Sequence, residues 1–189
     1  MSVRNSPSRR SFRVELFFKD IPDLEQRVQF LNQHGVDRFN LVNKNKKDEM
    51  DAWVDAIRDV SPEADISSHY SIKYNKIPRK RPQEQKENFL KALSQSQADE
   101  ILIVNGSGDK MAWNTVSALE AVSKASVESP LLAVAYNPYF PNQDEQDKEN
   151  QRLKDKLATG CVGKVYLQFG SDLGRLKTGL EYLDGLNLQ

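Results

Sequence analysis

The sequence predicts an α/β fold, a parallel (β/α) barrel-like domain with about six visible units, in effect an incomplete TIM-type barrel. Short apolar runs alternate with segments of helical period, and the runs begin near residues 12, 37, 65, 100, 131 and 163. This spacing of roughly 25 to 35 residues is the βα rhythm of a parallel sheet. A closed eight-unit barrel typically needs ~250 residues. With 189 residues, the last units are absent or the sheet stays open.

Six strands are expected from these runs, several of them continuously apolar as in parallel strands covered on both faces. They are FRVELFF (12–18), DRFNLVN (37–43), DISSHYSI (65–72), EILIVN (100–105), LLAVAYN (131–137) and GKVYLQF (163–169). We expect them to lie in sequential order in one sheet.

Apolar side chains at helical spacing fill the segments between these runs, and we expect them to pack against the sheet. The clearest stripes are Leu24, Val28 and Leu31; Met50, Trp53, Val54 and Ile57; Phe89, Leu90 and Leu93; and Leu173, Leu176, Leu180 and Leu183.

A dinucleotide-binding fold is the main competitor, and it needs a glycine-rich turn directly after the first strand. Here that strand continues into KDIPDLEQ, which contains no glycine. The glycine-rich loop NGSGDK (105–110) follows the fourth strand instead, where it offers a weak signal for anion binding.

Composition narrows the class of protein further. The chain carries 27 Lys+Arg and 27 Asp+Glu, so no global field favours nucleic acid or an anionic membrane. One cysteine and two histidines exclude an internal disulfide and a cysteine-based zinc site. No apolar run approaches the ~18–20 residues that span a bilayer. We expect a soluble, cytoplasmic protein with one domain (12–189) behind a disordered basic tail (1–11), and no metal, nucleic-acid or membrane partner.

Polar side chains at the carboxyl ends of the strands predict a ligand pocket, although loop entries favour polar residues anyway. They are Glu15, Asn43, His69, Asn105, Tyr136, Asn137 and Gln168. Glu15 lies in an apolar strand, and burial favours the protonated form of a carboxyl group, which then donates a proton near neutral pH. The alternative is an ion pair with Arg13 on the same strand face. For His69 the alternative is a hydrogen-bonded, half-buried structural histidine.

These residues, in this order, resemble the methylenetetrahydrofolate reductase family of flavin-dependent barrels. VELFF (14–18) is similar to the family's Phe-Glu-Phe-Phe-Pro-Pro strand, and SHYSIK (68–73) to its Pro-His-Leu-Thr-Cys strand. Residues 133–169 resemble its Ala-Tyr-Pro-Glu-x-His-Pro segment, its Leu-Lys-x-Lys-x-x-Ala-Gly helix end and its Thr-Gln-Phe-Phe strand.

The resemblance implies that FAD carries a hydride from NAD(P)H to 5,10-methylenetetrahydrofolate, giving 5-methyltetrahydrofolate. Glu15 would be the catalytic proton donor to the folate, and Gln168 would bind the pterin. The implied cofactor-binding positions are His69, Asn105, Ser107, Asp109, Tyr136, Glu149, Arg152 and Lys156.

Several positions depart from the family pattern. The Leu-Arg-Gly-Asp after the fourth strand is Val104-Asn105-Gly106-Ser107 here, and Asp109 replaces its aspartate only with a two-residue shift. The Val-Thr-Tyr-Gly after the second strand is VNKN (42–45), and Arg152 stands where the family has Asn. The alternative function is therefore a catalytically inactive barrel relative that binds or interacts. The open edges of such a sheet would be covered by the tail, by a partner subunit in a homo-oligomer, or by further residues.

Overall fold

The computed structural model of the chain describes residues 13–75, 82–105, 113–125 and 127–186. The expected basic tail (1–11) lies outside these ranges, as do the candidate site residues Ser107 and Asp109.

Within the described ranges, six strands alternate with six helices. The strands are β1 (Val14–Glu15), β2 (Arg38–Leu41), β3 (Asp65–Ser71), β4 (Glu100–Val104), β5 (Leu131–Tyr136) and β6 (Lys164–Leu167). The helices are α1 (Ile21–Gln33), α2 (Met50–Val60), α3 (Pro82–Gln95), α4 (Thr115–Ala125), α5 (Gln143–Leu157) and α6 (Leu173–Gly185).

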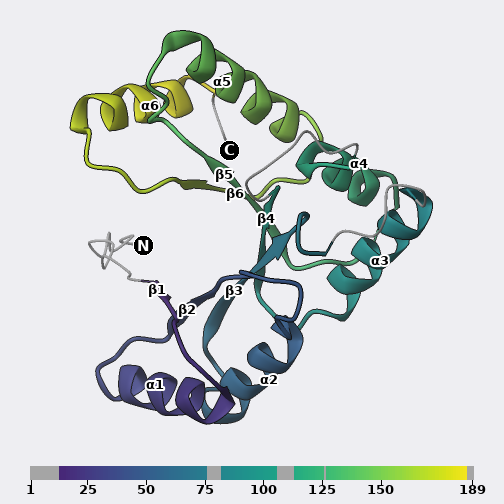
Figure 1. Cartoon of the computed structure of the whole chain (residues 1–189), viewed down its shortest axis with the longest axis vertical. Helices are drawn as coiled ribbons and strands as arrows, with labels where there is room; N and C mark the ends of the chain where they lie inside the picture. Colours follow the sequence, from purple (N-terminus) through teal and green to yellow (C-terminus); the bar gives the residue numbers. More distant parts are fainter. Residues whose placement is uncertain (1–12, 76–81, 106–112, 126, 187–189) are drawn as a thin grey trace, which may run out of the picture.

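All six strands belong to one parallel sheet in the order β1-β2-β3-β4-β5-β6. The sheet curls into a half-barrel, and the helices lie along its convex side (Figure 1). The predicted fold and strand order are confirmed, and the reversed order of a doubly wound sheet is excluded. β1 is shorter than expected, because its ladder joins only Val14 and Glu15 to Phe39 and Asn40.

The two-residue alternation of the strands separates an apolar face from a largely polar one. Phe39 and Leu41 of β2 point to the convex side and are fully buried in the core under the helices. On β1, Val14 and Leu16 belong to the same core, and Phe18 packs edge-to-face on Trp53 of α2, as expected. The alternate residues of the strands point to the concave side.

The helical stripes behave as predicted on α1 to α3 and only in part on α6. Leu24 and Val28 of α1 are fully buried. On α6, Leu183 packs against the core and Leu176 is half-buried, as predicted, whereas Leu173 and Leu180 are 77% and 44% exposed. The buried residue of α6 is Gly179, at which a Cβ atom would lie 2.5 Å from Cβ of Pro138.

β1 and β6 form the two edges of the described sheet. Exposed aromatic side chains follow both of them, Phe17 (58% exposed) after β1 and Phe169 (92% exposed) after β6. The covering of these edges stays a prediction.

We expect Gly179→Ala to lower the free energy of unfolding by about 1–3 kcal/mol, because the added methyl group meets Pro138. Gly185→Ala on the same helix is the matched control, since nothing lies within 4 Å of its Cβ position. The control should leave stability unchanged or raise it by up to about 1 kcal/mol. Urea denaturation measures both, and equal effects would contradict the packing of α6 through Gly179.

Candidate functional site on the concave face

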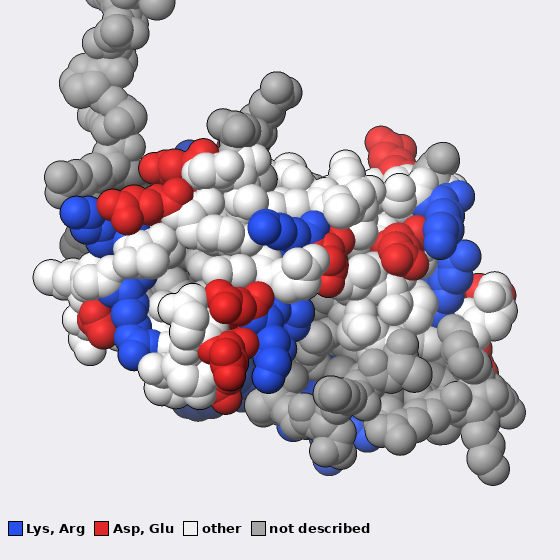
Figure 2. All heavy atoms as spheres, turned by 90° about the horizontal axis from the view of Figure 1, so that it is seen from above, with Lys and Arg blue, Asp and Glu red and all other residues white. Residues whose placement is uncertain are grey.

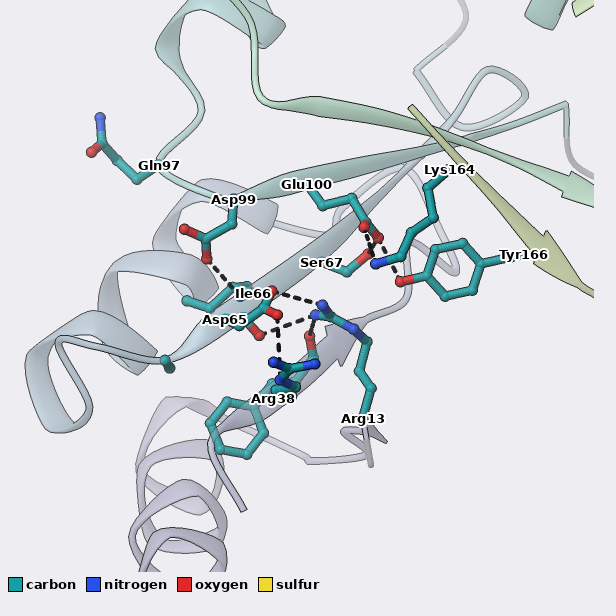
Figure 3. A network of polar contacts seen from close by, with 12 residues as sticks. Arg13, Arg38, Asp65, Ile66, Ser67, Gln97, Asp99, Glu100, Lys164 and Tyr166 are labelled. Carbon is teal, nitrogen blue, oxygen red and sulfur yellow. Dashed lines mark hydrogen bonds and ion pairs between the residues drawn. The ribbon is translucent and has the colours of Figure 1, made fainter. Parts of the chain in front are cut away.

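A layer of polar contacts crosses the concave face near the amino-terminal ends of the strands (Figure 3). At its centre is Glu100 of β4, whose side chain is only 3% exposed. Its carboxylate accepts hydrogen bonds from Lys164 Nζ at 2.5 Å, from Tyr166 Oη at 2.5 Å and from Ser67 Oγ at 2.7 Å. Glu100 therefore joins β3, β4 and β6.

β5 lies between Glu100 and its two partners on β6. Its inward residues opposite Lys164 and Tyr166 are Ala133 and Ala135. Because these side chains are small, the longer side chains of β6 reach over β5 to the carboxylate. The small residues of β5 thus allow Lys164 and Tyr166 of β6 to reach Glu100 of β4.

The charge state of Glu100 follows from these contacts. Burial alone would raise the pKa of Glu100, but the hydrogen bonds from Lys164, Tyr166 and Ser67 outweigh it and hold the pKa below its ordinary value. The carboxylate is therefore ionised at neutral pH, with its charge compensated inside the sheet.

Arg13 extends the layer to β1. Its guanidinium donates to Asp65 Oδ1 at 2.6 Å and to the carbonyl oxygens of Phe39 and Asp65 at 3.0 Å each. Burial lowers the pKa of Arg13, but the hydrogen bond to Asp65 and the nearby side chains of Tyr166, Asp65 and Glu100 raise it overall. Arg13 directly precedes the edge strand β1 and Tyr166 belongs to the other edge strand, β6, and both are part of the polar contacts drawn in Figure 3.

Glu15 and Gln168 lie two residues beyond Arg13 and Tyr166 on the same strand face, at the carboxyl-terminal opening. The ladder continues to this level, because Gln168 N donates to Tyr136 O at 2.8 Å. Both side chains are exposed. The expected burial of Glu15 is thus wrong, since β1 is an edge strand, and Arg13 pairs with Asp65 instead of Glu15.

His69 lies between them on β3, on the same face as Ser67. Burial lowers the pKa of His69 to about 4, against the opposing effect of the Glu100 charge, so the imidazole is neutral at physiological pH. Its Nε2 atom is buried without a hydrogen-bond partner among the described residues. His69 is half-buried, as the structural alternative supposed, but this nitrogen is left unsatisfied.

Tyr136 and Lys156, two of the expected cofactor-binding residues, lie on the other face of the sheet. Tyr136 is buried in the convex core, and its hydroxyl donates to Asn150 Oδ1 at 2.8 Å. Lys156 of α5 donates from Nζ to Ala135 O at 2.9 Å, and burial lowers the pKa of Lys156. Both side chains fix α5 to β5.

Glu149 and Arg152 also contribute to the contact between α5 and the end of β5. Glu149 Oε1 accepts from the backbone N–H of Asn137 at 3.2 Å, and its Oε2 accepts from Arg152 Nε at 2.9 Å. Asn105, another expected cofactor residue, accepts from Thr115 N at 2.8 Å and Thr115 Oγ1 at 3.0 Å, at the start of α4. The structure therefore brings Glu15, His69 and Gln168 to one concave face, and places Tyr136, Glu149, Arg152 and Lys156 around α5.

Sequence reasoning missed the polar layer beneath the candidate site. One signal was present: Glu100 opens the strongly apolar run EILIV, where an acid needs a partner. Its partners on β6 are 64 and 66 residues away, and no local pattern links them.

No protein-family model and no curated protein matches the chain. The resemblance to the reductase family therefore depends on the quoted motifs alone.

The described residues contain neither a membrane-spanning helix nor a cluster of metal ligands. No helix there combines the length and apolar character needed to cross a membrane. The same residues contain no group of three or more His, Cys, Asp or Glu side chains placed to hold a metal ion. On the face seen in Figure 2, basic and acidic side chains are interspersed rather than gathered by sign.

We expect Glu100→Gln to lower the free energy of unfolding at neutral pH by about 1–3 kcal/mol, because a neutral amide replaces the carboxylate that Lys164 neutralises. The lower part of this range is the more realistic, since Lys164 is 42% exposed and partly screened by solvent.

The pH dependence of this difference follows from the lowered pKa of Glu100. The stabilisation is fully present above the ordinary carboxyl pKa and is lost as the pH falls through the folded-state pKa. The difference in the free energy of unfolding between wild type and Glu100→Gln should therefore decrease as the pH falls. Denaturation at several pH values tests this, with Glu181→Gln at an exposed ion pair as control. A difference in the free energy of unfolding that stays constant with pH would contradict an ionised Glu100 at the centre of the layer.

Proposed function

We propose that this chain binds a reduced folate, or a related pterin, on the concave face of its half-barrel. The observation that carries the proposal is that Glu15, His69 and Gln168 all belong to the concave face of the one sheet. A carboxylate, a neutral imidazole and an amide on that face offer both hydrogen-bond donors and acceptors to a ligand. The family resemblance implies that Glu15 is the proton donor to the folate, that Gln168 binds the pterin and that His69 binds the cofactor.

The residues that the resemblance assigns to FAD give less support for binding of that cofactor. Tyr136, Glu149 and Lys156 already use their polar groups in contacts that join α5 to β5. A cofactor held by these residues requires those contacts to break. As found, this part of the chain does not fit FAD, and we derive no chemical step through it.

Calorimetric titration with 5-methyltetrahydrofolate tests the proposal directly. Binding by the wild-type protein that weakens in Gln168→Ala supports it. Absence of binding, or binding that Gln168→Ala leaves unchanged, overturns the concave site. Lys177→Ala, at an exposed ion pair on α6, is the control for nonspecific effects.

A second candidate function is the full reductase, with FAD and NAD(P)H as cofactors and 5,10-methylenetetrahydrofolate as substrate. Its supporting observation is the exposure of the Glu15 side chain at the opening, where a substrate nitrogen can reach it. In such an enzyme Glu15 would donate the proton that opens the folate ring.

For this candidate we expect Glu15→Gln to lower turnover about 10²–10⁴-fold, because one proton transfer is lost. The thermal midpoint should stay close to that of wild type, since the side chain is exposed and Arg13 bonds to Asp65. Turnover with NAD(P)H and FAD, and the visible absorbance of purified protein, are the measurements. Full turnover in the variant would contradict the catalytic role, whereas folate binding without flavin absorbance or turnover would leave the binding function alone.

A further inference from the structure

A small cavity lies on the convex side of the sheet, between α2 and α3 (Figure 1). Its volume is about 280 Å³, slightly below the ~300–1,000 Å³ of typical ligand pockets, so it suits a ligand of only a few heavy atoms. Residues of α2, β3, β4 and α3 line it. The proposed folate site is on the opposite, concave side, so the cavity and a ligand in it are independent of the proposed function.

Ser68 of β3 provides a hydroxyl group in the floor of this cavity. Its register partners are Leu41 of β2 and Ile101 of β4, which both belong to the apolar core of the convex side. Ser68 itself is 3% exposed. Its hydroxyl has no hydrogen-bond partner among the described residues, but the cavity reaches this residue. Because a buried hydroxyl is nearly always hydrogen-bonded, the cavity is where its partner would lie.

The solvent side of the cavity is acidic. Asp48, Glu49 and Asp51 line it, and its lining includes no lysine or arginine. The Asp48 carboxylate already accepts hydrogen bonds from the backbone N–H groups of Lys44 and Asn45. Asp51, in the first turn of α2, has no hydrogen bond or ion pair with any described residue. This charge disfavours an anionic ligand and attracts a cation.

The next charged residue on the same helix face also leaves Asp51 uncompensated. Asp55 follows Asp51 by one turn, and it carries the same charge. Although Asp51 remains in contact with solvent, partial desolvation and the charge of Asp55 raise the pKa of Asp51. A position in the first turn of a helix favours an acid, which explains why the fold tolerates this charge without a partner. A bound cation would stabilise its ionised form.

The remaining walls of the cavity are mostly apolar. They include Ala52 of α2 and Ala92 and Leu93 of α3. Tyr70, two residues after Ser68 on the same strand face, adds an aromatic ring and a hydroxyl group. Burial raises the pKa of Tyr70 to about 12, so this hydroxyl is neutral at physiological pH and can accept a hydrogen bond. A ligand with a short aliphatic body and a cationic head group fits these walls.

We propose that this cavity binds a small aliphatic amine in its ammonium form, with the ammonium group paired to Asp51 and hydrogen-bonded to Ser68 Oγ. An ammonium group has three N–H donors and no acceptor, which matches one carboxylate and the hydroxyl groups of Ser68 and Tyr70. The aliphatic body then lies against the apolar walls from α2 and α3. A free amine and a lysine side chain of a partner protein present the same head group, and the experiment distinguishes them.

The test is titration of the full ¹⁵N-labelled chain with n-butylamine hydrochloride, followed by the shifts of its backbone amide signals. n-Butanol is the neutral analogue, butyrate the anionic one, and sodium chloride at equal concentration the control for ionic strength. The variants are Ser68→Ala, Asp51→Asn and Asp55→Asn. Asp55→Asn is the matched control, because it removes the same charge one turn along α2 from a residue that does not line the cavity.

We expect n-butylamine to shift the amides of Asp51, Ser68 and Leu93 together with a Kd of about 1 mM, and n-butanol and butyrate to bind at least about tenfold more weakly. Asp51→Asn should weaken binding about tenfold, and Asp55→Asn about twofold or less. Ser68→Ala should weaken binding about fivefold. Its free energy of unfolding should equal or exceed that of wild type, because the variant removes an unpaired buried hydroxyl.

Absence of these shifts, shifts spread over all exposed acids, or equal binding of n-butanol overturns the proposal and leaves water as the partner of Ser68. Affinity for n-butylamine that Asp51→Asn leaves unchanged overturns it as well. Titration with Nα-acetyl-lysine amide identifies the source of the head group. Weaker binding of this compound than of n-butylamine supports a free amine as the ligand, whereas equal or tighter binding supports a lysine side chain in the same site.

Discussion

The carboxylate of Glu100 is the contact on which the shape of the concave face depends. It is nearly inaccessible to water and accepts three hydrogen bonds, two of which come from β6 across the full width of β5. An ionised carboxylate in this position would be strongly destabilising without those donors. The inward alanines of β5 make the contacts sterically permissible, so one acid, two small residues and two long side chains together keep β6 turned toward β4.

This curl has a direct consequence for ligand binding. On a flat sheet β1 and β6 would be its most distant strands, and no ligand of the size of a pterin could contact both. In the half-barrel, the curl turns β6 back over the concave side, and Glu15 and Gln168 follow Arg13 and Tyr166 by two residues on that same side. The polar layer therefore lies directly beneath the candidate residues on the concave face.

The spacing of apolar runs was sufficient to predict the fold class and the strand order, because short βα connections leave a parallel sheet few other arrangements. The alternation of side chains likewise placed Glu15 on the opposite face of β1 from Val14 and Leu16. Two features depended on tertiary contacts that no local pattern encodes. α6 approaches Pro138 closely through Gly179, and Leu173 and Leu180 of its predicted stripe remain exposed. Lys156 bonds to Ala135 O of β5 because α5 covers the convex side.

The most direct test of the account is the set of backbone amide NMR shifts that 5-methyltetrahydrofolate induces in the ¹⁵N-labelled protein. The account predicts that the amides of Glu15, His69 and Gln168 shift together although they are far apart in sequence, while the amides around Tyr182 of α6 do not shift. Shifts confined to the hollow between α5 and α6, or no shifts at saturating ligand, would contradict the assignment of the concave face as the binding site.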